Sequence, residues 1–143
     1  MDDHFDLQRF VDAQAGVFEH ALAELSAGRK RSHWMWFVFP QLKDLGRSPT
    51  ARHFGIASMD EARAYLAHPT LGPRLARATE AVLRADAASL NALFGSPDDL
   101  KFVSSMTLFS RTFGGDGGIY SQALARWHDG REDAATLELL SLA

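Results

Sequence analysis

The sequence predicts an all-α fold, a compact single domain over residues 1–143 with about seven or eight mostly short helices. Apolar residues recur at spacings of three and four along most of the chain, which is the period of an amphipathic helix. Short polar residues and glycines stand where these runs begin and end. No segment alternates apolar and polar residues with enrichment in β-branched types, so no strand is predicted.

The first helix is predicted over the apolar stripe from Leu7 to Leu25. Asp6 is expected to cap its start, since a short acidic side chain can accept a hydrogen bond from the first free amides. Gly28 is expected to follow its end, because glycine tolerates the left-handed conformation found just past a helix.

Six later helices are predicted from start and stop signals. Ser58 with Glu61 three residues later is a capping box. Residues 43–57 contain turn residues without a clear period, so a loop is expected there. The six expected helices, with their expected caps, are 58–68 (Ser58), 70–83 (Thr70), 86–95 (Asp86), 96–113 (Ser96), 119–128 and 133–142 (Asp133).

The stretch GRKRSHWMWFVFPQ, residues 28–41, joins basic residues to a run of large apolar ones. A strand here would be apolar on both faces and would need partner strands, which are not evident. A short buried helix, capped by Ser32 and ended before Pro40, is therefore predicted. Trp36 is expected to lie in the core of the protein, where its replacement by alanine would cost about 3–5 kcal/mol.

Two interpretations of this stretch remain open. In the first, it is a core helix preceded by solvated basic residues. In the second, it is a binding site: the basic side chains and free helix amides attract an anion, the histidine supplies acid/base capacity, and a tryptophan stacks on a ring. The residues of the second interpretation are Arg29, Lys30, Ser32, His33, Trp34 and Trp36.

The helix expected over residues 96–113 has a polar stripe beside its apolar face. Asp98, Lys101 and Ser105 fall within this stripe at helical spacing. One interpretation is that small hydroxyl residues simply allow close helix packing. The other is that these three side chains face a shared polar pocket, where the carboxylate holds the ammonium group one turn away.

Composition limits the classes of function. The net charge of −3 and the pI near 6.0 argue against a nucleic-acid binder. The absence of cysteine fits a cytoplasmic protein, and the N-terminus does not resemble a signal peptide. The longest apolar run is far too short to cross a membrane. Neither the histidine spacing nor the glycine-rich FGGDGGIY predicts a metal site or a cofactor site.

Three motifs carry a resemblance to a known family: SHWMWFVFPQL, EARAYLAHPTLGPRL and DDLKFVSSMTLFS. In this order and spacing they resemble the bacterial family called domain of unknown function 1810, over about Phe5 to Leu140. The resemblance implies a mainly α-helical single domain and brings no established activity. Some members are labelled calpastatin, but an inhibitor of that type is disordered, whereas this composition is that of a globular protein.

A weaker resemblance, in size and in an aromatic motif with a nearby histidine, is to the helical NADAR family. That family is associated with ADP-ribose and with N-glycosidase chemistry. No catalytic residue can be carried over from it.

Two functional hypotheses follow. The first is a domain that binds an anionic, nucleotide-like small molecule, with Gln41, Lys101 and Ser105 donating hydrogen bonds beside the basic stretch. If it is an enzyme, N-glycosidic cleavage is the expected reaction, and the candidate catalytic residues are His33, Asp98 and Asp99. The second is a non-catalytic protein-interaction domain, which leaves a homo-oligomer open. Convergent polar groups in a pocket would favour the first, and a flat apolar patch would favour the second.

Overall fold

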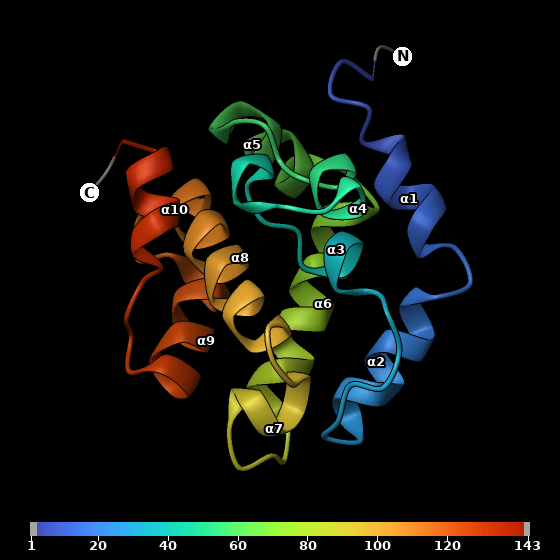
Figure 1. Cartoon of the computed structure of the whole chain (residues 1–143), viewed down its shortest axis with the longest axis vertical. Helices are drawn as coiled ribbons and strands as arrows, with labels where there is room; N and C mark the ends of the chain where they lie inside the picture. The colour runs from blue at the N-terminus through green and yellow to red at the C-terminus, as the bar shows by residue number, and fades with distance from the viewer. Residues whose placement is uncertain (1–2, 142–143) are drawn as a thin grey trace.

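The structure is a computed structural model that describes residues 3–141 (Figure 1). Within this range it is all-helical, as predicted, with an isolated parallel bridge between Leu42 and Ile56 as its one β-type pairing. None of the described helices is long and apolar enough to cross a membrane. The elements are α1 Gln8–Gln14, α2 Phe18–Ser26, α3 Met35–Val38, η1 Lys43–Leu45, α4 Pro49–His53, α5 Met59–Ala67, α6 Leu71–Arg84, α7 Leu90–Phe94, α8 Asp98–Phe113, α9 Gly118–His128 and α10 Ala134–Leu139.

The ten described α-helices exceed the predicted number partly because the first predicted helix is two helices. The backbone leaves the helical region at Ala15, and Gly16 follows with φ +72°, so the chain turns between α1 and α2. The predicted cap at Asp6 is wrong. Asp3 accepts hydrogen bonds from the amides of Leu7 and Gln8 instead.

The segment predicted as a loop over residues 43–57 contains the other extra helix, α4. The Ser48 hydroxyl accepts a hydrogen bond from the Ala51 amide, and Pro49 occupies the first turn. Both are ordinary helix-start signals. The prediction failed because the helix has only five residues and so shows no periodicity.

The remaining starts were predicted unevenly. Ser58 and Asp133 cap α5 and α10 through side-chain hydrogen bonds, as expected. Asp86 and Ser96 are not caps: Ser89 caps α7, and α8 begins one residue after Pro97. The predicted end of the last helix at Leu142 lies outside the described residues.

Two long helices, α6 and α8, organise the packing (Figure 1). Helix α8 contacts α5, α7, α9 and α10, while α6 contacts α2, α5 and α9. Gly72 allows α6 to start against α5, since a Cβ there would lie 2.2 Å from the Leu66 carbonyl oxygen. The aromatic side chains that are at least nine-tenths buried in this core are Phe10, Phe18, Trp34, Phe39, Tyr65, Phe94, Phe102, Phe109 and Tyr120.

Candidate functional site

The carboxylate of Glu24, on α2, holds the segment that precedes α3. It accepts hydrogen bonds from the amides of Arg31 (2.8 Å) and Ser32 (3.0 Å), from the Ser32 hydroxyl (2.6 Å) and from the Trp34 indole (2.9 Å). Partial burial alone would raise the pKa of Glu24, but these four donors outweigh it and lower the pKa to about 2. Glu24 therefore stays ionised and fixes the basic segment.

This arrangement corrects two predictions about Ser32. It does not cap α3, whose N-cap position is Trp34 and which has no side-chain cap. Its hydroxyl, predicted to bind a ligand, donates a hydrogen bond to the Glu24 carboxylate at 2.6 Å.

Trp34 is the tryptophan that forms the core. Its side chain is 0% exposed and packs against the rings of Phe39 and Phe94. The structure therefore places it in the core, with no exposed face on which a ring could stack. The prediction of Trp36 as the core residue is wrong, because Trp36 is only half-buried. A four-residue helix does not reveal from its sequence which tryptophan turns inward.

Lys30, Asp98 and Lys101 form one charged cluster. Lys30 Nζ lies 2.9 Å from one carboxylate oxygen of Asp98, and Lys101 Nζ lies 3.7 Å from the other. Lys30 is fixed through its backbone as well as its side chain, because its amide donates a hydrogen bond to the Leu93 carbonyl at 2.7 Å. Two ammonium groups share one carboxylate, so the cluster carries a surplus positive charge.

Trp36 and His33 lie beside this cluster. Lys101 Nζ is 5.7 Å from the centroid of the Trp36 ring, a cation–π distance. The His33 and Trp36 ring centroids are 6.5 Å apart, and His33 is exposed. The structure thus places three of the predicted residues next to one another: His33, Trp36 and Lys101.

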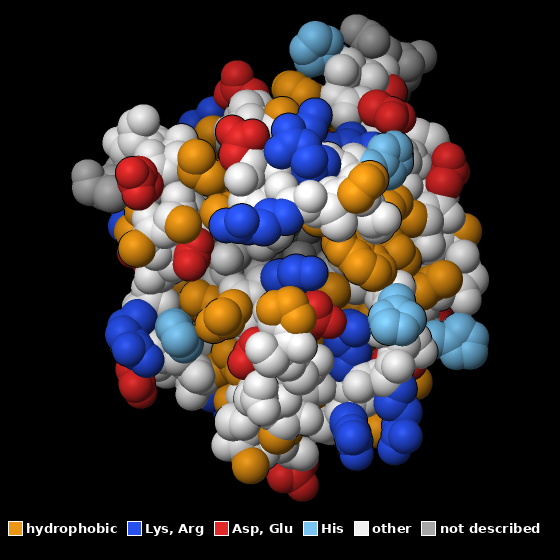
Figure 2. All heavy atoms as spheres, viewed as in Figure 1, with side chains coloured by type: hydrophobic (Ala, Val, Ile, Leu, Met, Phe, Trp, Pro, Cys, Tyr) orange, Lys and Arg blue, Asp and Glu red, His pale blue; other side chains and the backbone are white. Residues whose placement is uncertain are grey.

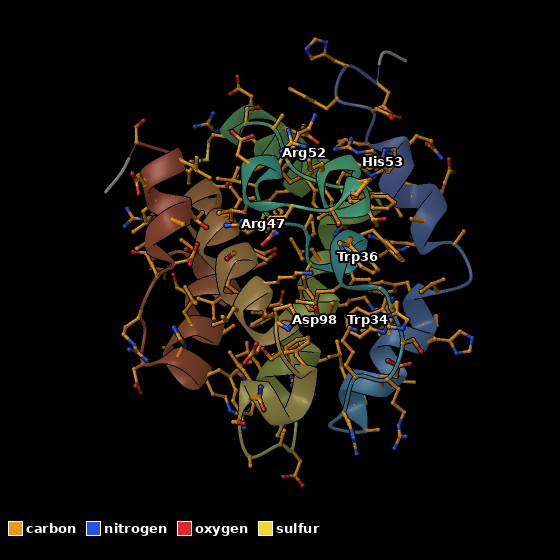
Figure 3. The ribbon with its side chains drawn as sticks, viewed as in Figure 1. Trp34, Trp36, Arg47, Arg52, His53 and Asp98 are labelled. Carbon is orange, nitrogen blue, oxygen red and sulfur yellow. The ribbon has the colours of Figure 1, made fainter. Side chains whose placement is uncertain are left out.

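A cleft of about 440 Å³ separates the chain around α4 from the first turns of α8. In Figure 2, basic side chains lie next to a hollow near the centre of this face, and Figure 3 labels Arg47 just before α4 and Asp98 at the start of α8. The lining combines two cations, one carboxylate, two hydroxyls and one side-chain amide with several apolar side chains. The residues that line the cleft are Gln41, Leu45, Gly46, Arg47, Ser48, Ala51, Pro97, Leu100, Lys101, Ser104, Asp133 and Ala135.

A much smaller pit, of about 10 Å³, adjoins the cleft. Gln41, Ala51 and Lys101 line both spaces. Trp36 and Phe54 line only the pit. The side chains of Gln41 and Lys101 therefore border both the open cleft and the aromatic surface of the pit.

Of the predicted site residues, Gln41 and Lys101 line the cleft itself, while Asp98, Lys30 and His33 do not. Three more predicted residues are also outside its lining. Ser105 is 0% exposed inside α8, and its hydroxyl has no hydrogen-bond partner among the described residues. The Asp99 carboxylate bonds the Asn91 side chain and the Leu100 amide. Arg29 is exposed on the segment before Lys30.

Sequence reasoning missed Arg47, Ser48 and Ser104, which line the cleft. The Ser48-Pro49 pair was the available signal for α4, and it would have placed Arg47 just ahead of a helix. No local pattern could show that Arg47 and Lys101 meet, since 53 intervening residues separate them in the sequence. Within residues 3–141, no cluster of three acidic or histidine side chains could hold a metal ion.

Comparisons with known proteins agree with this fold. A family profile described as "Protein of unknown function (DUF1810)" matches residues 4–140. No curated protein matches the chain. The crystal structure of the conserved hypothetical protein Rv1873 from Mycobacterium tuberculosis is 51% identical, with a TM-score of 0.94, over 99% of this chain and 100% of that one. The chain belongs to the DUF1810 family of proteins of unknown function.

Proposed function

We propose that the cleft between the α4 region and α8 binds a small anionic molecule. The observation that carries this proposal is the pair of cations on its lining, Arg47 and Lys101, which come from two separate segments. Lys30 already neutralises Asp98, and Arg47 makes no ion pair with any residue between 3 and 141. The Gln41 amide and the Ser48 hydroxyl also line the cleft and can donate hydrogen bonds to an anion.

Carboxylates near the cleft do not cancel this charge. Asp133 also lines it, but its Oδ2 accepts hydrogen bonds from the Thr136 amide (2.9 Å) and hydroxyl (2.6 Å) as the cap of α10. Asp98 and Asp133 together are outnumbered by Lys30, Lys101 and Arg47. An anion would therefore find unbalanced positive charge in a concave site.

A thermal-shift experiment tests the proposal with pyrophosphate, AMP and ADP-ribose as probes. A ligand at a hundred times its dissociation constant should stabilise the wild type by about 2.7 kcal/mol. Arg47→Ala and Lys101→Ala should each lose most of this stabilisation, because each removes one of the two cations. Arg29→Ala is the matched control, since it removes an exposed basic residue outside the cleft. The proposal fails if no probe stabilises the wild type, or if the control loses as much as the cleft variants.

We also propose a reaction to test in this cleft: hydrolysis of an N-glycosidic bond. Of the two predicted carboxylates we choose Asp98, because it contacts Lys101, which lines the cleft, whereas Asp99 bonds the Asn91 side chain and the Leu100 amide. In such a reaction the C1′–N bond breaks, water supplies hydroxide to C1′ and a proton to the base, and a carboxylate stabilises the oxocarbenium-like state.

Chromatography of AMP incubated with the protein would show adenine and ribose 5-phosphate if this reaction occurs. Asp98→Asn should then abolish release of the base, while Asp99→Asn should leave it largely unchanged. Recovery of intact AMP from a protein that binds it would mean that the cleft binds without cleaving.

The alternative of a protein-interaction domain finds less support on the described surface. The large apolar side chains that are mostly exposed there are Leu100, Phe113 and Leu139. Leu100 and Phe113 lie near opposite ends of α8, about 20 Å apart at 1.5 Å per residue. Leu100 and Phe113 therefore do not belong to one flat patch, whereas cations from two separate segments line the cleft.

A further inference from the structure

We infer that the ligand of the cleft contains an aromatic ring and an anionic group such as a phosphate. Without ligand, the Lys101 ammonium occupies the position over Trp36 where the ring would stack. When the ligand binds, the ammonium moves to the anionic group and the ring takes its position. This inference rests on the proposed function and narrows it to a class of ligand. It assigns Lys101 two alternating positions: over Trp36 without ligand, and beside the anion with it.

Lys101 is the cation that can move. Its side chain is 27% exposed, and its ion pair with Asp98 is long, at 3.7 Å. Lys30, by contrast, is 7% exposed and lies 2.9 Å from the same carboxylate. When Lys101 leaves, Asp98 keeps its closer partner, so the displacement strands no unpaired charge.

The surface that Lys101 covers is suited to a ring. Trp36 is half-buried and lines the pit together with the half-buried Phe54. At about 10 Å³ the pit holds at most about one water molecule. A ring can therefore enter the pit beside Trp36 only after the Lys101 ammonium, 5.7 Å from the indole centroid, has turned toward the cleft.

The energies favour this exchange. A cation–π contact at an exposed site contributes about 0.5–1 kcal/mol. Stacking of a base on an aromatic side chain contributes about 1–3 kcal/mol, and the ammonium gains a charged hydrogen bond to the anion. A ligand with a ring and an anionic group gains both the stacking energy and the charged hydrogen bond. An anion without a ring gains only the hydrogen bond and leaves Trp36 uncovered.

The test compares AMP with ribose 5-phosphate, which has the same phosphate and sugar but no ring. Titration calorimetry should show AMP binding about tenfold more tightly to the wild type, since tenfold corresponds to about 1.4 kcal/mol. Trp36→Leu should remove the preference, and Trp36→Phe should retain most of it because a ring remains. Melting temperatures of both variants, measured without ligand, establish that they are folded.

The outcomes separate this inference from the proposed function. Equal affinity for the two compounds in the wild type would overturn the inference while the proposed function stands. Absence of binding by either compound would overturn the proposed function and the inference with it. A preference for AMP that survives in Trp36→Leu would place the ring elsewhere and also overturn the inference.

Tryptophan emission supplies a second readout. Trp34 is fully buried, and Trp127 donates its indole N–H to the Val82 carbonyl on α6, away from the cleft lining. AMP should change the emission of the wild type, and the change should vanish in Trp36→Phe. An unchanged emission in a protein shown to bind AMP would contradict stacking on Trp36.

Discussion

Replacing Trp34 with alanine is expected to lower the free energy of unfolding by about 3–5 kcal/mol. The side chain is 0% exposed, so the change leaves a large cavity between Phe39 and Phe94. It also leaves the Glu24 carboxylate without its indole donor. Urea denaturation followed by circular dichroism measures the loss.

Trp36→Ala is the matched control for this prediction. Trp36 lies two residues further along the chain, inside α3, and is half-buried, so its replacement should cost no more than about 2 kcal/mol. Equal losses in the two variants would contradict the assignment of Trp34 as the core tryptophan.

Glu24→Ala is expected to cost about 3 kcal/mol, because hydrogen bonds to a charged group contribute about 1.5–3 kcal/mol each and are not additive. The four donors released lie on Arg31, Ser32 and Trp34, so the segment that carries Lys30 should loosen as well. Urea denaturation measures the first effect, and amide hydrogen exchange at residues 29–33 measures the second. A variant as stable and as protected as the wild type would contradict this role.

The same carboxylate makes stability depend on pH. Its folded-state pKa, about 2, lies below the ordinary value of 4.5. The unfolded chain therefore takes up a proton first, and the contribution of Glu24 is complete above about pH 4.5 and is lost as the pH falls toward 2. Glu24→Gln should flatten the dependence of the urea midpoint on pH over that window. Glu80→Gln, which changes an exposed pair on α6, should leave it as in the wild type.

The fold was largely predictable because helix signals are local. The caps at Ser58 and Asp133 and the end of α8 at Phe113 all follow from neighbouring residues. The break between α1 and α2 was not predictable in this way, because the apolar stripe continues through it in the sequence. Only the left-handed backbone of Gly16 shows that the chain turns there.

The sequence predicted some of the residues that border the cleft and missed others. Lys101, Gln41 and Trp36 do lie at the cleft or the adjoining pit, and the charged cluster joins the basic stretch to α8. Trp34 and Ser105 point inward instead, since residue type does not decide which side of a helix faces the core. Arg47 required the tertiary structure.

A crystal structure of the protein with AMP tests the central claim most directly. The account predicts the phosphate about 3 Å from both the Arg47 guanidinium and Lys101 Nζ, with Lys101 withdrawn from the Trp36 ring. It would be contradicted by AMP bound elsewhere, for example beside Arg74 and Arg77, whose guanidinium groups lie 5.4 and 5.5 Å from the Phe18 ring. A cleft that stays empty at saturating AMP would contradict it equally.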